Sequence, residues 1–218
     1  MSNQSSNNKR IARNTLLLYF RMFITMAVGL FTSRVILDSL GVEDYGIYNL
    51  VGGFVTMFNV FRAGLIASTQ RFITFDLGKG DMDELRSTFS TSLIIFLFIS
   101  CVIFVIAETT APWFIQNKLT IPACRMTAAM WVFQFSLITL ILNLISSPYN
   151  ALIIAHEKMG AFAYISIFEV VAKLAVAYAI YISPFDKLVV YALLLCVVQL
   201  IIRFMYSIYC NRHFKESK

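Results

Sequence analysis

Charged side chains are scarce in this sequence. Asp, Glu, Lys and Arg make up 14% of the 218 residues, while 59% are hydrophobic; a soluble domain carries about 25% charged residues. The charges gather in short clusters separated by long apolar stretches. A soluble core does not need that arrangement, but a bilayer does, because each membrane-spanning helix takes about 20 mostly apolar residues. The composition therefore predicts a membrane protein that crosses the bilayer several times.

Patterns typical of catalytic, metal and nucleotide sites are also lacking. The four cysteines are widely scattered with no C-x-x-C or Cys/His ligand spacing, and no G-x-x-x-x-G-K-[ST] loop is present. His156 and His213 have no Ser, Cys or Asp at a spacing that suggests a triad. The net charge of +6 comes without a basic stripe interleaved with aromatics. We expect no enzyme activity, no catalytic residue, no cofactor or metal, no disulfide and no nucleic-acid partner.

Long apolar runs predict an all-α transmembrane helix bundle of about six spans. The runs cover approximately residues 14–37, 47–72, 89–107, 126–154, 162–182 and 188–209. Glycines in 41–46 predict the first turn, while Pro112 and Pro122 predict breaks within a longer connection between the third and fourth spans. We expect a polar cytoplasmic N-terminus without regular structure over residues 1–13, one compact lobe over 14–210, and a cytoplasmic tail or linker over 211–218.

Lys and Arg residues are unevenly distributed between the two ends of the predicted spans. If the N-terminus is cytoplasmic, the larger group falls on the inner side: Lys9, Arg10, Arg13, Arg71, Lys79, Arg86, Lys158, Arg212, Lys215 and Lys218. The smaller group falls on the outer side: Arg34, Lys118, Arg125 and Lys187. Because basic residues favour the cytoplasmic side, both termini are predicted to be cytoplasmic.

Several charged residues lie inside the predicted spans. A cation at the centre of a bilayer costs about 2.5–3.5 kcal/mol on insertion scales, so such residues are expected to face protein or water. Arg62 and Lys173 lie deep, whereas Arg21 and Arg203 are close enough to the inner side to extend into the interface. These four cations are candidate substrate-pathway residues, together with Glu169 and with Asn59 on the polar face of the second span.

Small and weakly polar residues recur on the same faces. For Gly52, Gly53, Thr56, Ser136 and Thr139, helix–helix packing is the favoured interpretation, because small side chains let membrane helices approach closely. The third span has almost no such residues and is expected to face lipid.

The balance of intramembrane charge bears on the substrate. Arg21, Arg62, Lys173 and Arg203 stand against one acid, Glu169, and this excess favours an anionic ligand such as a diphosphate. Glu169 and Lys173 are one helical turn apart, in the order that suits a salt bridge. As a free carboxylate, Glu169 would instead suit a Na⁺- or H⁺-driven antiporter.

Several segments resemble a known family. The stretch SRVILDSLGVEDYGIYNLVGGFV (33–55), followed by ASTQRFITFDLGKGD (67–81), is similar to polysaccharide-transport flippases related to O-antigen (Wzx-type) exporters. These belong to the multidrug/oligosaccharidyl-lipid/polysaccharide exporter superfamily. The similarity continues through SSPYNALIIAHEKMGAFAYISI (146–167) and IYCNRHF (208–214), and so covers nearly the whole chain.

The resemblance implies a six-helix lobe, normally followed by a second lobe, with the two lobes in a V around a central cavity. Cations of the first two helices line that cavity in related flippases, and Arg21 and Arg62 occupy comparable places here. The implied substrate is a lipid-linked anionic oligosaccharide (lipopolysaccharide precursor) carried on undecaprenyl diphosphate, moved across the bacterial inner membrane by alternating access.

The chain is expected to be a truncated transporter that is inactive alone, since one lobe would need to pair with a second lobe or protomer. Besides that partner, we expect membrane lipid and the lipid-linked oligosaccharide as ligands. Two alternatives stay open: a cation-coupled multidrug exporter lobe of the same fold, and a truncated, non-transporting membrane interaction protein.

Overall fold

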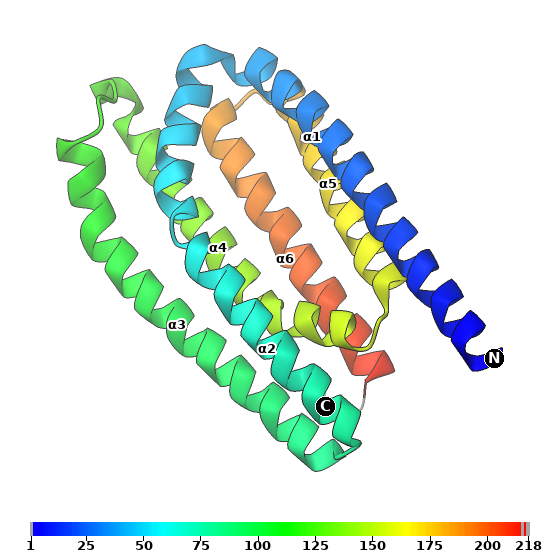
Figure 1. Cartoon of the computed structure of the whole chain (residues 1–218). Coiled ribbons are helices and arrows are strands. Elements are labelled where there is room, and N and C mark those ends of the chain that lie inside the picture. The colour runs from blue at the N-terminus through cyan, green and yellow to red at the C-terminus, as the bar shows by residue number, and fades with distance from the viewer. Residues whose placement is uncertain (1, 215, 217–218) are drawn as a thin grey trace.

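Helices make up nearly all of the structure. The computed structural model describes residues 2–214 and 216, and in this part of the chain it contains no strand. The elements are α1 (Ser2–Thr56), α2 (Asn59–Lys79), α3 (Met82–Asn117), the 3₁₀ turn η1 (Ala123–Arg125), α4 (Met126–Ala155), α5 (Met159–Ile182) and α6 (Lys187–His213). The helices run side by side as one bundle (Figure 1). The prediction of an all-α transmembrane bundle is confirmed.

The number of spans depends on how α1 is counted. Among the described residues, five helices are long and apolar enough to cross a membrane, and the first of them, Ala12–Thr56, is a single stretch of 45 residues. Gly41 divides this stretch, because its backbone (φ 79°, ψ 169°) is not helical. The chain reverses there, and the second arm of α1 runs back beside the bundle and is continued by α2 (Figure 1). The first arm of α1 makes the first predicted crossing. The second arm, together with α2, makes the second.

The second span is not one continuous helix, contrary to the prediction for residues 47–72. A turn at Met57 and Phe58 separates α1 from α2. In this turn Phe58 N donates to Val55 O at 3.2 Å and Val60 N to Met57 O at 3.4 Å, so two bonds join residues three apart instead of four. Gly52 and Gly53 precede the turn, and glycine weakens a helix by about 1 kcal/mol relative to alanine.

The third span is longer than predicted, and Pro112 does not end it. α3 continues through Pro112 to Asn117, leaving only a short connection before η1. Proline lacks one N–H, so within a long helix it removes a single backbone bond, and neighbouring turns preserve the rest. At its other end α3 is capped by Asp81, whose carboxylate accepts from Asp83 N at 3.0 Å and Glu84 N at 3.1 Å.

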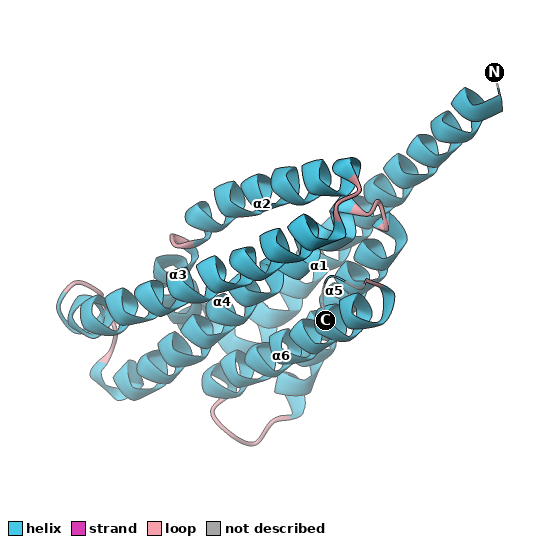
Figure 2. Cartoon of the chain, turned by 90° about the horizontal axis from the view of Figure 1, so that it is seen from below, coloured by secondary structure: helices cyan, strands magenta, loops and turns pink. Residues whose placement is uncertain are grey.

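The polar N-terminus also differs from the prediction. Backbone from Ser2 onward is helical and extends α1 past the other helices (Figure 2). An existing helix gains one hydrogen bond for each residue added, so extension does not need the apolar pattern that identifies a span. The side chains of residues 1–11, including Lys9 and Arg10, lie outside the described part of the chain, as do Lys215 and Lys218.

Helix α4 is the centre of the bundle, packing against α1, α2, α3, α5 and α6. Its side chains Val132, Phe133, Leu137 and Leu144 are fully buried. By contrast, α3 lies at the edge and packs mainly on α4 and α2, with a row of exposed apolar residues: Ile94, Ile95, Leu97, Phe98, Phe104 and Val105. This exposed row agrees with the expectation that the third span faces lipid.

The interhelical turns divide between the two ends of the bundle. Both termini and the α2–α3 and α4–α5 turns lie at one end, which we call the terminal end; the Gly41 turn and the α3–α4 and α5–α6 connections lie at the other, the far end (Figure 1). At the far end Arg125 Nη2 is 2.5 Å from Asp44 Oδ2, and its Nη1 is 2.8 Å from Asp186 Oδ2. One guanidinium therefore joins the Gly41 turn, η1 and the α5–α6 turn.

Replacing Gly41 with alanine should destabilise the bundle. A side chain at this φ and ψ is strained, at a cost of about 1–3 kcal/mol. We expect Gly41→Ala to lower the melting temperature of the detergent-purified protein, measured by light scattering or intrinsic fluorescence. Gly46→Ala is the matched control, because a Cβ there meets nothing within 4 Å and the φ of Gly46 is ordinary. Equal melting temperatures for the two variants would contradict this account of the turn.

Removing the guanidinium of Arg125 should weaken the far end. Asp44 is only 6% exposed, and a buried carboxylate that loses its partner costs about 1–3 kcal/mol. Arg125→Gln should therefore melt at a lower temperature than Arg34→Gln, which removes an exposed arginine from α1. If the double variant Arg125→Gln/Asp44→Asn melts no higher than Arg125→Gln, the unpaired Asp44 charge is not the cause.

Candidate functional site

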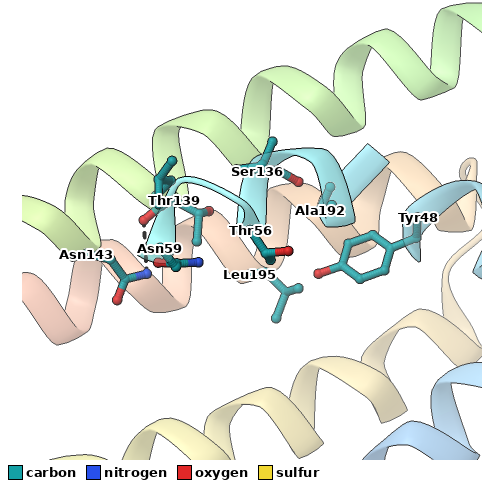
Figure 3. Close-up of a pocket in the computed structure, with 11 residues that line it drawn as sticks. Tyr48, Thr56, Asn59, Ser136, Thr139, Asn143, Ala192 and Leu195 are labelled. Atoms are coloured by element: carbon teal, nitrogen blue, oxygen red, sulfur yellow. Dashed lines mark hydrogen bonds between the residues drawn. The ribbon is translucent and has the colours of Figure 1, made fainter. Parts of the chain in front are cut away.

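A polar cavity lies between the two arms of α1 and helices α2, α4, α5 and α6. It consists of two adjoining hollows of about 200 and 370 Å³, which share Tyr48, Thr139, Asn143 and Leu195 on their walls. Figure 3 shows side chains from several of these helices around the smaller hollow. The polar wall residues are Thr25, Thr32, Tyr48, Thr56, Asn59, Ser136, Thr139, Asn143, Lys173, Tyr191 and Gln199.

The break in the second span shapes this cavity. Gly52 and Thr56 on one side of the break and Asn59 on the other all line the smaller hollow. Irregular backbone at membrane depth is tolerated where it is buried in protein or lines a polar cavity, and this break satisfies that condition. Asn59, a predicted site residue, therefore reaches the cavity from the first turn of α2.

The favoured interpretation of the small residues as helix-packing positions is wrong for most of them. Gly52, Thr56, Ser136 and Thr139 lie on the cavity wall. A Cβ added at Gly52 or at Gly53 would meet nothing within 4 Å, so neither glycine allows a close helix contact. Spacing along a helix identifies a common face, but it does not distinguish a face that packs from one that borders open space.

A pair of hydrogen-bonded amides lies on the wall of the polar cavity. Gln199 Nε2 on α6 donates to Asn143 Oδ1 on α4 at 3.0 Å, and Asn143 Nδ2 donates to Thr139 O at 3.1 Å. Gln199 is 3% exposed, and such a buried amide in a membrane helix needs a partner. Tyr48 and Tyr191, which line the same hollow, meet edge to face with their ring centroids 4.8 Å apart. The candidate residues chosen from sequence omit Gln199 and Asn143, although amides inside a span were a signal that could have included them.

The predicted ion pair between Glu169 and Lys173 is present. Lys173 Nζ lies 2.6 Å from Glu169 Oε1, one turn apart on α5. Lys173 also lines the larger hollow, where it faces Thr25 and Gly29 of α1 and Gln199 of α6. The ammonium group of Lys173 is therefore the one full positive charge on the described wall of the polar cavity.

Two arginines extend this charge toward the terminal end. Arg62 Nε donates to Ser147 Oγ at 3.0 Å, and Glu169 attracts Arg62 electrostatically. Arg21 Nη1 lies 3.5 Å from Ser166 Oγ, and its guanidinium lies 4.4 Å from the centroid of the Phe162 ring.

Tyr206 of α6 interacts with both arginines. It shares a side-chain hydrogen bond with Ser166 and interacts electrostatically with Arg21, Arg62 and Glu169. We call Arg21, Arg62, Lys173 and Glu169 the cationic cluster, since it holds three cations and one carboxylate.

Arg203 is the predicted site residue that the structure does not bring into this cluster. Its guanidinium stacks on Tyr149, 4.4 Å from the ring centroid. Its Nη1 is buried and has no hydrogen-bond partner among the described residues, and the same is true of Arg21 Nε. Buried donors of this kind are usually satisfied by water or a ligand.

The side chains of this site are suited to binding anionic and polar groups. The described residues contain no group of three or more His, Cys, Asp and Glu side chains that could hold a metal. Guanidinium and ammonium groups form strong hydrogen bonds to phosphate and carboxylate oxygens, and the amides and hydroxyls of the polar cavity can pair with neutral polar groups. A helical bundle with a polar, charged interior at membrane depth has the architecture of a membrane transporter.

The chain belongs to the MatE family, whose model matches residues 15–179, most of its length. The match runs from the first arm of α1 to nearly the end of α5 and so includes all four members of the cationic cluster. The protein is therefore a multi-pass membrane exporter of the multidrug/oligosaccharidyl-lipid/polysaccharide superfamily. A search of curated proteins and a search of solved structures each gave no match.

A cysteine on the wall of the polar cavity should react with a water-soluble thiol reagent. In a background with the four native cysteines changed to alanine, we expect Thr56→Cys to be labelled by a membrane-impermeant maleimide in reconstituted vesicles. Phe98→Cys is the control, since Phe98 is 69% exposed on the apolar face of α3 and should lie in lipid. If Thr56→Cys reacts no faster than Phe98→Cys, the cavity is not accessible to water.

Proposed function

We propose that this chain is a lobe of a flippase that moves a lipid-linked anionic oligosaccharide, carried on a diphosphate, across the bacterial inner membrane, with both termini cytoplasmic. The observation that supports this most is the excess of cations at membrane depth. Arg21, Arg62 and Lys173 surround one carboxylate, Glu169, next to a polar cavity. The cluster keeps a net positive charge that an anionic group can neutralise.

The partners of the arginines favour this function over a purely structural role. Arg62 is bound to the hydroxyl of Ser147, and Arg21 approaches the hydroxyl of Ser166. A hydroxyl orients a guanidinium without cancelling its charge. Most N–H donors of each guanidinium are therefore left for a ligand. Bidentate binding of phosphate oxygens is the interaction for which arginine is best suited.

The polar cavity suits the sugar portion of such a substrate. Its wall offers neutral donors and acceptors from Thr56, Asn59, Ser136 and Asn143, together with the ring of Tyr48. Sugars present many hydroxyls and apolar ring faces, which amides, hydroxyls and aromatic rings can bind together. Arg62 follows Asn59 by one turn on α2, so a diphosphate at the cluster would place its attached sugar at this cavity.

Alternating access requires a second half that closes against this one. We propose that the lobe pairs with another lobe or with a second protomer, so that the cationic cluster faces a space between the two halves. Membrane lipid would cover the exposed apolar face of α3, on the side away from the polar cavity.

A cation-coupled multidrug exporter is the second candidate, because Glu169 is a carboxylate at membrane depth. Its oxygen Oε1 is 2.6 Å from Lys173 Nζ, and it also attracts Arg62. A carboxylate shared by two cations is poorly placed to take up and release a further Na⁺ or H⁺. The contacts of Glu169 therefore favour the anionic substrate.

Charge-changing variants test the proposal in cells that depend on this exporter for surface polysaccharide. Arg62→Gln should reduce the displayed polysaccharide at least tenfold, because it removes the guanidinium group and lowers the net charge of the cationic cluster by one. The double variant Glu169→Gln/Lys173→Gln keeps the net charge and should be impaired much less. Arg34→Gln, with an exposed side chain at the far end, controls for general loss of charge.

All variants must reach the membrane at wild-type levels, measured by immunoblotting. Display that is unchanged in Arg62→Gln would refute the anionic substrate. Loss of drug efflux in Glu169→Gln, with polysaccharide display intact, would establish the multidrug alternative.

A further inference from the structure

A second cavity opens at the terminal end of the bundle. It has a volume of about 500 Å³, and its wall combines Arg13 of α1, Leu77 of α2, the α4–α5 connection and Tyr209 of α6. It shares no lining residue with the polar cavity. Five helices and the α4–α5 connection thus contribute to a hollow that the proposed transport pathway does not use.

Two exposed cations line this cavity. Arg13 and Lys158 are exposed, and within the described part of the chain neither forms an ion pair or a side-chain hydrogen bond. His156 on the same wall is already engaged, with Nε2 2.5 Å from Glu216 Oε1 and its ring stacked on Phe214. Glu157 is the acidic residue of the wall.

Backbone donors add to the positive potential. The wall includes Met159, Gly160 and Ala161, the first residues of α5. No side chain caps this helix, and the Phe162 N–H is the one that bonds back to Lys158 O, at 3.3 Å. The three preceding N–H groups have no acceptor within the helix and carry the positive end of its dipole. At Gly160 the space is open, since a Cβ would meet nothing within 4 Å.

We propose that this cavity binds a phosphate group, held by the side chains of Arg13 and Lys158 and by the backbone N–H groups at the start of α5. A cation of α1 and a cation of the α4–α5 connection line the same hollow as these backbone donors, and the hollow is large enough for a headgroup. The phosphate can belong to an anionic phospholipid at the membrane surface or to a soluble phosphate compound. The proposal does not depend on what the exporter carries.

The test uses the full-length protein in detergent and compares two charge-matched variants. Arg13→Gln/Lys158→Gln removes both cations of the cavity. Arg86→Gln/Arg212→Gln removes two exposed arginines from the same end, on α3 and α6, that do not line the cavity. Native mass spectrometry measures retention of phosphatidylglycerol against phosphatidylcholine, and isothermal titration measures the binding of pyrophosphate.

We expect the cavity variant, and not the matched control, to lose at least tenfold in affinity for one of these ligands. Selective loss of phosphatidylglycerol identifies a lipid headgroup, and selective loss of pyrophosphate identifies a soluble phosphate compound. Equal loss in both double variants, or no loss in either, would overturn the proposal. Melting temperatures of the two variants are compared first, so that a misfolded protein is not counted as a loss of binding.

Discussion

The cost of placing a charge in hydrocarbon governs the arrangement of this bundle. Arg21, Arg62 and Lys173 lie on helices that cross the membrane, and none of these groups can be left against lipid without a penalty of about 2.5–3.5 kcal/mol. Each has a polar partner inside the bundle: Ser166, Ser147 and Glu169. The packing of α1 on α5 and of α2 on α4 thus also provides the cations with their partners. Apolar contact alone would not select these faces, because lipid tails are as apolar as leucine.

The same constraint explains where the backbone is irregular. Gly41 reverses the chain at the far end, where water can reach the backbone, while the turn at Met57 and Phe58 lies between helical segments of one crossing. An unpaired backbone group in hydrocarbon costs several kcal/mol, so the second break requires a polar environment. The polar cavity provides it, and Asn59 and Arg62 follow within the first turn of α2. A broken helix next to intramembrane charge is typical of transporter binding sites.

Local features were predictable from the sequence, and long-range ones were not. The spans and the Glu169–Lys173 pair depend on spacing within one helix, which the sequence displays directly. The bond from Arg62 to Ser147 joins residues 85 positions apart, and no periodicity encodes it. The continuation of α3 through Pro112 depends on neighbouring turns, and the distance between Arg203 and the cluster depends on how α6 is rotated against α4. Residues that line the cavity and residues that pack helices together are of the same types. The cavity could therefore not be identified from the sequence.

The two ends of the bundle differ in how their charges are satisfied. At the far end Arg125 is held by two carboxylates, so its charge is neutralised and three connections are fixed together. Toward the terminal end, Arg21 and Arg62 have hydroxyl partners, and Arg13 and Lys158 have none among the described residues. The charge of Arg125 is therefore neutralised within the protein, whereas the guanidinium groups of Arg21 and Arg62 keep positive charge for a ligand.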